Sequence, residues 1–385
     1  MDFKKIRFSL LEISYWCAMG AYPTFVISYF IYDRGYTATV TGVLMSAYTL
    51  AAFVGQFFWN YLSDRIRSNK VIAVFTNACG AALYLALYFS QPLPLVSVLY
   101  TLLGFIMPSL STNIDTWILK TYADTPYVYG PIRSVGSLFY AVFMLFYGGL
   151  LLKYGYILML WFGLSFVAVS MLLIVSLPDA PQRPKSETAP VKKHGVVGGV
   201  FLLMLAAMFI SNISLTPVGS MIAVTLKKLH GSAADQAYFL CAHALLEFPM
   251  MLLTYKLAQF IKPVNRLFIS CVTYTVALVY IVVTQTPSGI ILASALLGVG
   301  YGLFLPALRE YVFAVAPKGR ENAMQGVTDT VGNNLSAAIG STAAGTIADV
   351  SGVPVLLYAA MILQGVSTAM FFLLTKLSRR VRAKE

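Results

Sequence analysis

The sequence predicts an all-α integral membrane protein whose twelve transmembrane helices form two six-helix halves, with both chain ends in the cytoplasm. Three observations predict this architecture. The chain is 58% hydrophobic and only 11% charged, whereas soluble domains carry about 25% charged residues. Apolar runs long enough to cross a bilayer recur from end to end. One long polar segment divides these runs into two equal groups.

The apolar runs predict helices and not a barrel. Each run has about the 20 residues that cross a hydrocarbon core roughly 30 Å thick as a helix, and each is continuous and not alternating. The twelve predicted spans are residues 8–31, 38–60, 71–90, 94–117, 131–152, 156–177, 197–222, 236–259, 265–284, 289–313, 324–347 and 353–375.

The basic residues predict the orientation. With the amino terminus in the cytoplasm, all of the 27 Lys and Arg residues fall on the cytoplasmic side except Arg34, Lys153, Lys227 and Lys228. This is the positive-inside pattern. The net charge of +12 is therefore interpreted as a topology signal and not as a nucleic-acid surface. It predicts a multi-pass protein of the inner (cytoplasmic) cell membrane.

The polar segment, which is rich in Pro, Lys and Ser, predicts a cytoplasmic linker at residues 178–196 between halves at 1–177 and 197–385. The halves echo each other at an offset of 194 residues. Pro23 falls on Pro217, Leu102-Leu103-Gly104 on Leu296-Leu297-Gly298, and Asp115 on Arg309. Repeated six-helix halves with a binding site between them are a transporter architecture.

Two opposite charges lie in neighbouring spans. Asp115 is in the last third of span 94–117, and Arg133 is just inside span 131–152. Each charge costs about 2.5 to 3.5 kcal/mol near the centre of a membrane helix, and less if the two meet inside the bundle. A buried structural ion pair is the alternative. We interpret the pair as a substrate-binding site.

The loop after the second span resembles a signature of the major facilitator superfamily. It reads Asn60-Tyr-Leu-Ser-Asp-Arg-Ile-Arg-Ser-Asn-Lys70, and the family signature is Gly-x-Leu-Ala-Asp-Arg-x-Gly-Arg-Lys. The match covers Leu62, Asp64, Arg65 and Lys70, and departs where Asn60 and Arg67 replace glycines. In that family the acid helps to latch the cytoplasmic side, which implies a gating role for Asp64 and Arg65.

Two further motifs resemble lactose permease and the related oligosaccharide and nucleoside proton symporters. They are Met19-Gly20-Ala21-Tyr22 and Tyr129-Gly130-Pro131-Ile132-Arg133-Ser134-Val135-Gly136-Ser137. In that group an acid eighteen residues before the arginine binds the sugar, and Asp115 stands at that spacing from Arg133. The resemblance also implies that Tyr140 takes the place of a sugar-stacking aromatic residue. Tyr22 is a weaker candidate for substrate binding.

The second half carries a predicted proton-coupling pair in span 236–259. His243 and Glu247 are four residues apart and so share one helix face. A desolvated carboxyl group can hold a proton near neutral pH, and a histidine could exchange it. The alternative is a neutral acid and histidine within helix packing. The histidine and acid that the symporters place in span ten have no counterpart, because Leu296–Gly300 is apolar.

Four more polar residues are candidates, and two of them have two interpretations. Glu12 lies near the cytoplasmic end of its span and could bind or snorkel to the surface. Arg309, beside Glu310, could form an interfacial pair or act as the second-half partner of the first-half acid. Asp329 and Asn333 in span 324–347 could line the cavity, with Asn333 in contact with the substrate. The small residues from Gly340 to Gly345 predict close helix packing.

Together these features predict a secondary active transporter. It would import a small polar solute such as a sugar, oligosaccharide or nucleoside with protons, by alternating access; a small carboxylate would suit the same anchors. A proton-antiporting exporter of drug-like compounds is the alternative. A membrane sensor that binds without transport is an alternative from another class, although no loop is long enough for a soluble output domain.

The sequence predicts no enzyme, cofactor or metal site. No nucleophile, base and orienting group are recognisable together, and no phosphate-binding Gly-rich loop with Lys appears. The four cysteines lie in apolar runs without metal-ligand spacing. The coupling ion is predicted to be the proton. The predicted partners are a small solute and the lipid bilayer, with no nucleic acid, and the protein is expected to be a monomer.

Overall fold

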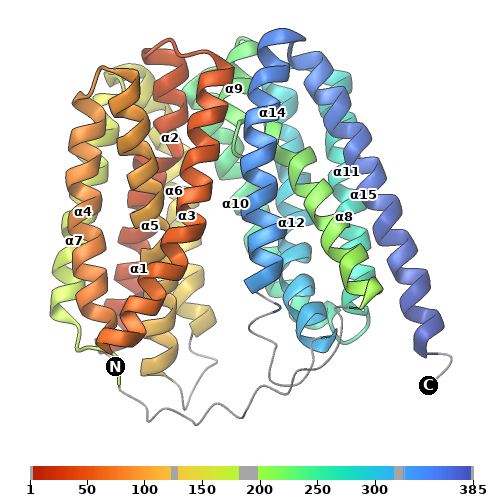
Figure 1. The fold of residues 1–385 in the computed structure, drawn as a ribbon, viewed down its shortest axis with the longest axis horizontal. Coiled ribbons are helices and arrows are strands. Elements are labelled where there is room, and N and C mark those ends of the chain that lie inside the picture. Colours follow the sequence, from red (N-terminus) through yellow and green to blue (C-terminus); the bar gives the residue numbers. More distant parts are fainter. Residues whose placement is uncertain (1–2, 123–128, 182–197, 316–323, 325, 383–385) are drawn as a thin grey trace. The chain divides into compact units, whose positions relative to one another are not determined.

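The computed structural model describes residues 3–122, 129–181, 198–315, 324 and 326–382, and the elements that it contains there are all helices (Figure 1). The chain forms two compact units. The first comprises Met1–Tyr36, Val43–Pro184 and Ser232–Cys241, and the second comprises Thr37–Gly42, Lys185–Gly231 and Ala242–Glu385. The predicted linker at 178–196 lies outside the described residues from residue 182 onward.

Ten helices in the described part of the chain are long and apolar enough to cross a membrane. They are α3 (Ala38–Ile66), α4 (Asn69–Phe89), α5 (Leu93–Thr121), α6 (Tyr129–Tyr154), α7 (Ile157–Ser176), α8 (Gly199–Leu215), α10 (Ala233–Leu257), α11 (Pro263–Thr284), α12 (Pro287–Val315) and α15 (Val353–Arg382). Each one overlaps a predicted span.

The other two predicted spans are divided into shorter elements. Residues 8–31 fall on α1 (Phe3–Ala21), α2 (Pro23–Ser28) and the π-helix η1 (Tyr29–Asp33). Residues 324–347 fall on the π-helix η4 (Thr328–Leu335) and on α14 (Ser336–Val350). Neither region counts among the ten, because α1 begins with several charged residues and α14 has only 15 residues.

The sequence similarity between the two halves corresponds to a helix that is interrupted at the same position in each half. Pro23 starts α2 directly after α1, and Pro217 lies in the 3₁₀ turn η3 (Thr216–Val218) between α8 and α9 (Ile222–Lys228). Proline has no N–H to donate and its ring crowds the preceding turn, so an α-helix is interrupted there. The paired prolines therefore break the first long helix of each half at corresponding positions.

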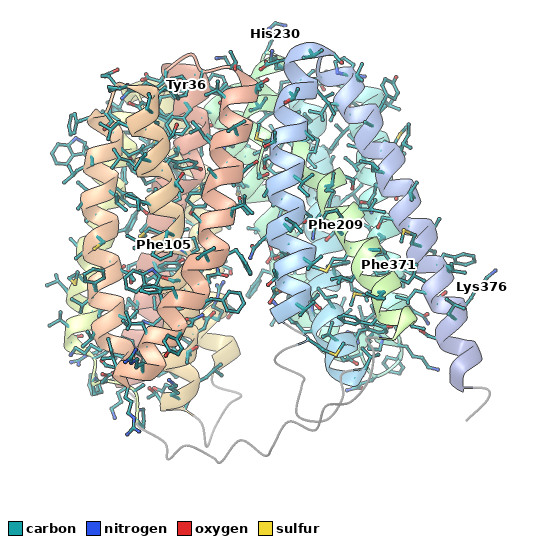
Figure 2. All side chains as sticks on the ribbon, viewed as in Figure 1. Tyr36, Phe105, Phe209, His230, Phe371 and Lys376 are labelled. Carbon is teal, nitrogen blue, oxygen red and sulfur yellow. The ribbon has the colours of Figure 1, made fainter. Side chains whose placement is uncertain are left out.

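Gly104 and Gly298, which correspond at the offset of 194 residues, make the same kind of helix contact. A Cβ atom on Gly104 of α5 would overlap the backbone carbonyl oxygen of Tyr48 on α3, and one on Gly298 of α12 would overlap that of His243 on α10. Both glycines therefore let two helix backbones touch. In the first unit α5 and α3 also meet at the next residue, Phe105, which is labelled in Figure 2. The carbonyl of Phe105 accepts a 3.1 Å hydrogen bond from the indole of Trp59.

The predicted close packing of the small-residue run in α14 is confirmed. A Cβ atom on Gly340 would overlap the Thr216 hydroxyl, and one on Gly345 would overlap the carbonyl oxygen of Ala38. Here α14 meets η3 and the start of α3 within the second unit. At Gly345 a side chain would push two backbones apart, and at Gly340 it would displace the Thr216 side chain.

Asp349, near the end of α14, acts as an N-terminal cap for α3 within the second unit. Its Oδ2 atom accepts hydrogen bonds from the Thr39 N–H at 2.7 Å and the Thr39 hydroxyl at 2.8 Å. Lys228 Nζ lies 3.0 Å from Oδ1. Partial burial raises the pKa of this carboxyl, but the bonds from Thr39 and Lys228 outweigh that effect and leave the pKa below its ordinary value.

Large apolar side chains stay exposed on the long helices. Leu172 is 72% exposed, Val283 78% and Leu292 64%. Exposed apolar surface of this extent is unusual on a soluble protein. On helices of spanning length it faces lipid, so the surface agrees with a multi-pass membrane protein.

A buried apolar cluster fixes the helices of the first unit around its charged residues. It joins α1, α5, α6 and α7. Leu11, Ile114 and Ile132 belong to it and are at most 1% exposed, and each is the chain neighbour of a charged residue. Because these anchors set the rotation of their helices, Glu12, Asp115 and Arg133 turn toward one another.

Candidate functional site

Three charged side chains from three helices meet in the first unit. Glu12 comes from α1, Asp115 from α5 and Arg133 from α6. Arg133 Nε lies 3.8 Å from Asp115 Oδ1 and 3.9 Å from Glu12 Oε2. The predicted contact between Asp115 and Arg133 is present, and Glu12 joins it as a second acid.

Exposure separates these three side chains. Asp115 and Arg133 are 28% and 27% exposed, whereas Glu12 is 2% exposed. The pair can therefore reach a bound molecule directly, and the second acid lies behind it. The interpretation that Glu12 snorkels to the surface is wrong, because the whole side chain is enclosed.

Trp16 completes this cluster and was not predicted from the sequence. Its indole N–H donates a 3.0 Å hydrogen bond to Glu12 Oε2, and the Arg133 guanidinium lies 4.1 Å from the ring centroid. Gly136 of α6 leaves room for this arrangement, because a Cβ atom there would come within 2.8 Å of the indole. The four-residue spacing of Glu12 and Trp16 was the available signal, since such residues share a helix face.

The two predicted tyrosines have different surroundings. Tyr140 is half-buried and lies edge-on to Trp16, with ring centroids 6.5 Å apart, so it lies beside the charged cluster. Tyr22 is fully buried. It stacks on Tyr84 at 4.0 Å and donates a 2.7 Å hydrogen bond to the Tyr84 carbonyl. Tyr22 was predicted to contact a substrate, but in this conformation its side chain has no exposed surface that a substrate could reach.

The second unit holds the predicted His243 and Glu247 pair on α10. His243 Nδ1 lies 3.4 Å from Glu247 Oε2, and the side chains are 25% and 22% exposed. Tyr301 of α12 lies 5.9 Å from the imidazole, measured between ring centroids. The glycine contact at Gly298 brings α12 close enough for this. The pair is thus partly accessible and has an aromatic neighbour.

A polar network links α12, η4 and α8 in the second unit. Arg309 Nη1 donates to Asp329 Oδ2 at 2.8 Å, and Asn333 Nδ2 donates to Asp329 Oδ1 at 3.3 Å. Asn212 donates to Asn333 Oδ1 at 3.0 Å. Arg309 thus pairs with Asp329, and its chain neighbour Glu310 contacts the buried Arg266. Arg309 of α12 meets two other sequence candidates, Asp329 and Asn333, which lie on the π-helix η4. Such π-helical segments are frequent at functional sites.

The predicted gating loop is partly described. Asp64 and Arg65 lie in the last turn of α3, but the Asp64 side chain is outside the described part of the structure. The Arg65 side chain is exposed. Lys70 Nζ donates to the Leu177 carbonyl at 2.8 Å, at the end of α7. Asp179 accepts the Lys70 N–H at 3.1 Å, so this loop and the end of α7 cap each other.

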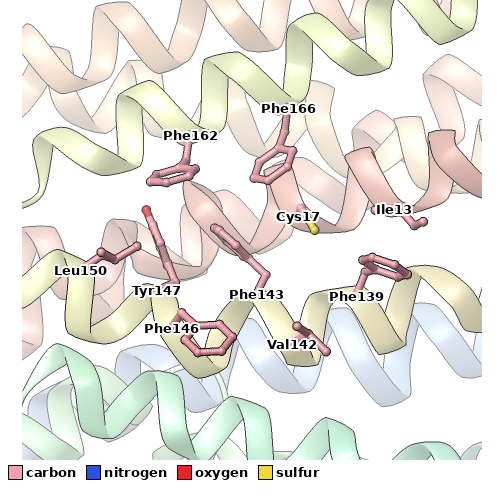
Figure 3. A pocket seen from close by; sticks show the side chains of 10 residues that line it. All are labelled: Ile13, Cys17, Phe139, Val142, Phe143, Phe146, Tyr147, Leu150, Phe162 and Phe166. Carbon is pink, nitrogen blue, oxygen red and sulfur yellow. The ribbon is translucent and has the colours of Figure 1, made fainter.

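An apolar pocket of about 280 Å³ lies between α1, α6 and α7 (Figure 3). Aromatic and aliphatic side chains dominate its lining, which consists of Ile13, Cys17, Phe139, Val142, Phe143, Phe146, Tyr147, Leu150, Phe162 and Phe166. The Tyr147 hydroxyl already donates to the Ala21 carbonyl at 2.7 Å. Without a charged group, this pocket cannot orient a polar solute.

Among the residues that the structure describes, no group of three or more His, Cys, Asp or Glu side chains could hold a metal ion. The four cysteines are free thiols, with Cys17 and Cys271 buried.

Comparison with known proteins places most of the chain in one family model. The model described as "Major Facilitator Superfamily" matches residues 8–341. The chain is also similar to an uncharacterized transporter, YwbF, of Bacillus subtilis (strain 168). The two are 24% identical over 314 residues, covering 80% of this chain and 77% of that protein.

Solved transporter structures share the fold. The nucleoside transporter NupG, as its D323A mutant, has a TM-score of 0.79 at 15% identity and covers 97% of this chain and 99% of its own. An auto-inhibited POT family peptide transporter has a TM-score of 0.73 at 13% identity, with coverages of 97% and 96%. A bacterial homolog of the human lysosomal transporter Spinster has a TM-score of 0.72 at 13% identity, also covering 97% and 96%.

Proposed function

Since this chain belongs to the Major Facilitator Superfamily and is a multi-pass membrane transporter, not an enzyme, we propose a transport function for it. It imports a small polar solute by proton symport. Sugars, oligosaccharides and nucleosides are the proposed solutes. The two units would alternate access to the two sides of the membrane, as expected for a secondary transporter.

The observation that carries this proposal is the partly exposed Asp115 and Arg133 pair. A guanidinium offers a planar set of donors, and a carboxylate offers acceptors. The vicinal hydroxyls of a sugar or ribose can accept from the one and donate to the other. Hydrogen bonds to charged groups contribute about 1.5 to 3 kcal/mol each. Tyr140 and Trp16 add aromatic surface beside the pair, which suits a sugar ring or a nucleobase.

Proton coupling is supported by Glu247, a partly buried acid within hydrogen-bonding reach of His243. Ionisable groups at membrane depth in transporters commonly serve as proton relays. One proton crossing 100 mV supplies about 2.3 kcal/mol, which at 1.4 kcal/mol per decade sustains roughly fifty-fold accumulation. The proton is the only coupling ion in this proposal, and no cofactor takes part.

The proposed topology completes the twelve spans. The divided segments α1, α2 and η1, and η4 with α14, would each cross the bilayer once, with both termini in the cytoplasm of an inner-membrane monomer. The polar network of Arg309, Asp329 and Asn333 would supply solute contacts from the second unit, and Asp64 with Arg65 would gate the cytoplasmic side.

Uptake by proteoliposomes tests the proposal. Vesicles that contain a pH dye receive radiolabelled lactose, uridine or benzoate with a proton gradient imposed inward. The wild type is compared with Asp115→Asn and Glu247→Gln, and with Asp33→Asn as a control that removes an exposed acid. We expect accumulation of one solute, with acidification inside the vesicles, in the wild type and the control.

Asp115→Asn should reduce uptake about 10- to 100-fold, because it removes a charged hydrogen-bond acceptor. Glu247→Gln should keep solute exchange and lose accumulation. If none of the three solutes moves under any gradient, or if protons flow only against a lipophilic cation, the import proposal fails and a proton-antiporting exporter takes its place.

A further inference from the structure

Two carboxyl groups share one guanidinium in the first unit. Arg133 Nε is nearly equidistant from Asp115 Oδ1, at 3.8 Å, and Glu12 Oε2, at 3.9 Å. With all three groups ionised, the cluster carries a net charge of −1. With one carboxyl protonated, the cluster is neutral. A net charge enclosed by protein and lipid is unfavourable, so the cluster as a whole favours binding one proton.

Burial decides which carboxyl takes that proton. Glu12 is 2% exposed, whereas Asp115 is 28% exposed and can be solvated. The charged groups that face Glu12 are Arg133 from α6, at 3.9 Å, and Asp115 from α5 on the other side of Arg133. On α6 Tyr140 lies behind the indole, and α7 contains no ionisable residue. Tyr15 is the further ionisable neighbour on α1 itself.

We propose that Glu12 is a second proton-binding group, at the solute site, and that its shared contact with Arg133 links protonation to solute binding. The inference rests on the proposed function, because it gives that symport a proton-binding residue in the first unit in addition to Glu247 in the second. It adds a proton-binding group to the anchors Asp115 and Arg133.

The shared guanidinium explains the linkage. When Glu12 is ionised, Arg133 is attracted to two carboxylates. When Glu12 takes up a proton at a carboxylate oxygen, only Asp115 opposes the guanidinium, and the N–H donors of Arg133 can turn to the solute. Linkage is reciprocal, so a bound solute must also raise the proton affinity of Glu12 by the same factor. Typical coupling between two sites is about 5- to 150-fold in affinity.

Trp16 reports on this proton without any transport. Its indole N–H donates to the same Oε2 atom at 3.0 Å, and its ring lies under the Arg133 guanidinium. Protonation of Glu12 replaces a charged acceptor with a neutral one directly beside the indole. The emission of Trp16 should therefore change with pH, and this signal depends on neither a solute nor a gradient.

The test is a fluorescence titration of the purified full-length protein between about pH 5 and pH 9. The Trp16 signal is the difference between each protein and the same protein carrying Trp16→Phe. We compare the wild type with Glu12→Gln, Glu12→Asp and Glu247→Gln. Glutamine keeps a hydrogen-bond acceptor for the indole but cannot titrate. Gel filtration in detergent confirms that each variant is folded.

We expect the Trp16 signal to titrate in the wild type and in Glu247→Gln, to be flat in Glu12→Gln, and to return in Glu12→Asp. A signal that is flat in the wild type, or that persists unchanged in Glu12→Gln, overturns the inference.

Transport then tests the linkage with whichever of lactose, uridine and benzoate the wild type accumulates. Raising the pH from 6 to 8 should weaken wild-type binding of that solute about tenfold, within the usual range of coupling. Binding to Glu12→Gln should be independent of pH, and this variant should exchange solute without accumulating it.

The two proposals fail in different ways. If Glu12→Gln still accumulates solute and moves protons while Glu247→Gln does not, symport stands and the role of Glu12 is refuted. If no tested solute is transported but the Trp16 titration disappears in Glu12→Gln, proton binding by Glu12 stands and the proposed import function is refuted.

Discussion

Arg133 holds the first-unit site together through three simultaneous contacts. Its Nε atom faces Asp115 and Glu12, and the central carbon of its guanidinium lies over the Trp16 ring, 4.1 Å from the centroid. A planar, delocalised cation can do this because its edge donates hydrogen bonds while its face stacks on an aromatic ring. A lysine at this position would keep the charge and lose the fork of donors and the stacking.

We therefore expect Arg133→Lys to weaken solute binding about 10- to 100-fold, because it removes at least one charged hydrogen bond of 1.5 to 3 kcal/mol. Arg34→Lys is the matched control. The Arg34 guanidinium also lies near an aromatic ring, 5.0 Å from the centroid of Tyr29, but it belongs to a separate cluster with Tyr88 and Gln91. The affinity of each variant for the transported solute is measured by equilibrium binding in detergent. Equal losses in the two variants would contradict the assignment of Arg133 to the site.

At the scale of the elements, the positions of the functional side chains depend on backbone contacts between helices. Gly298 lets α12 touch α10 at the carbonyl of His243, one helical turn from Glu247. Gly104 does the same for α5 and α3. Backbone atoms cannot rotate away as a flexible side chain can, so a larger residue at either glycine must separate the two helices.

Gly298→Ala should accordingly destabilise the protein by about 1 to 3 kcal/mol, the usual penalty of overpacking. Thermal unfolding in detergent, followed by tryptophan fluorescence, measures the change. Gly149→Ala on α6 is the control, since a Cβ atom there meets nothing within 4 Å. The control should be neutral or stabilised by up to about 1 kcal/mol, because alanine favours helix over glycine. A neutral Gly298→Ala would refute the contact.

At the scale of the whole molecule, the arrangement of charge along the chain defines an orientation in the membrane. The exposed residue Ser288, in the first turn of α12, belongs to the side predicted to lie outside, and Gln259, after α10, to the cytoplasmic side. In the predicted orientation the basic residues are concentrated on the cytoplasmic side, since translocating them during insertion is unfavourable.

In intact cells, an impermeant maleimide should label Ser288→Cys at once and Gln259→Cys only after permeabilisation. The unsubstituted protein is the control for its four native thiols, of which Cys17 and Cys271 are buried. Labelling of Gln259→Cys in intact cells, with Ser288→Cys protected, would reverse the orientation and place both termini outside.

Features that depend on local composition were predictable from the sequence. A run of about 20 apolar residues is a membrane helix whatever its neighbours are. A charge inside such a run needs a partner, which is why Asp115 and Arg133 could be paired in advance. Pro23 and Pro217 break helices through their own geometry. The spacing of His243 and Glu247 likewise guarantees a shared helix face.

Features that depend on how each helix is rotated were decided by the tertiary structure alone. Glu12 and Tyr22 lie on the same short stretch, yet one faces Arg133 and the other stacks in the core on Tyr84. The pairing of Arg309 with Asp329 across two elements is of the same kind. Helical periodicity gives the relative directions of residues on one helix but not the direction in which that helix faces its neighbours.

The sequence by itself thus determined that this protein is a helical membrane protein of a transporter family, because hydropathy, proline positions and charge are properties of short segments. The tertiary structure decided that the site is a three-residue charge cluster backed by Trp16. That cluster depends on glycine contacts and buried anchors between helices far apart in the chain, and packing of this kind is fixed only when the elements meet.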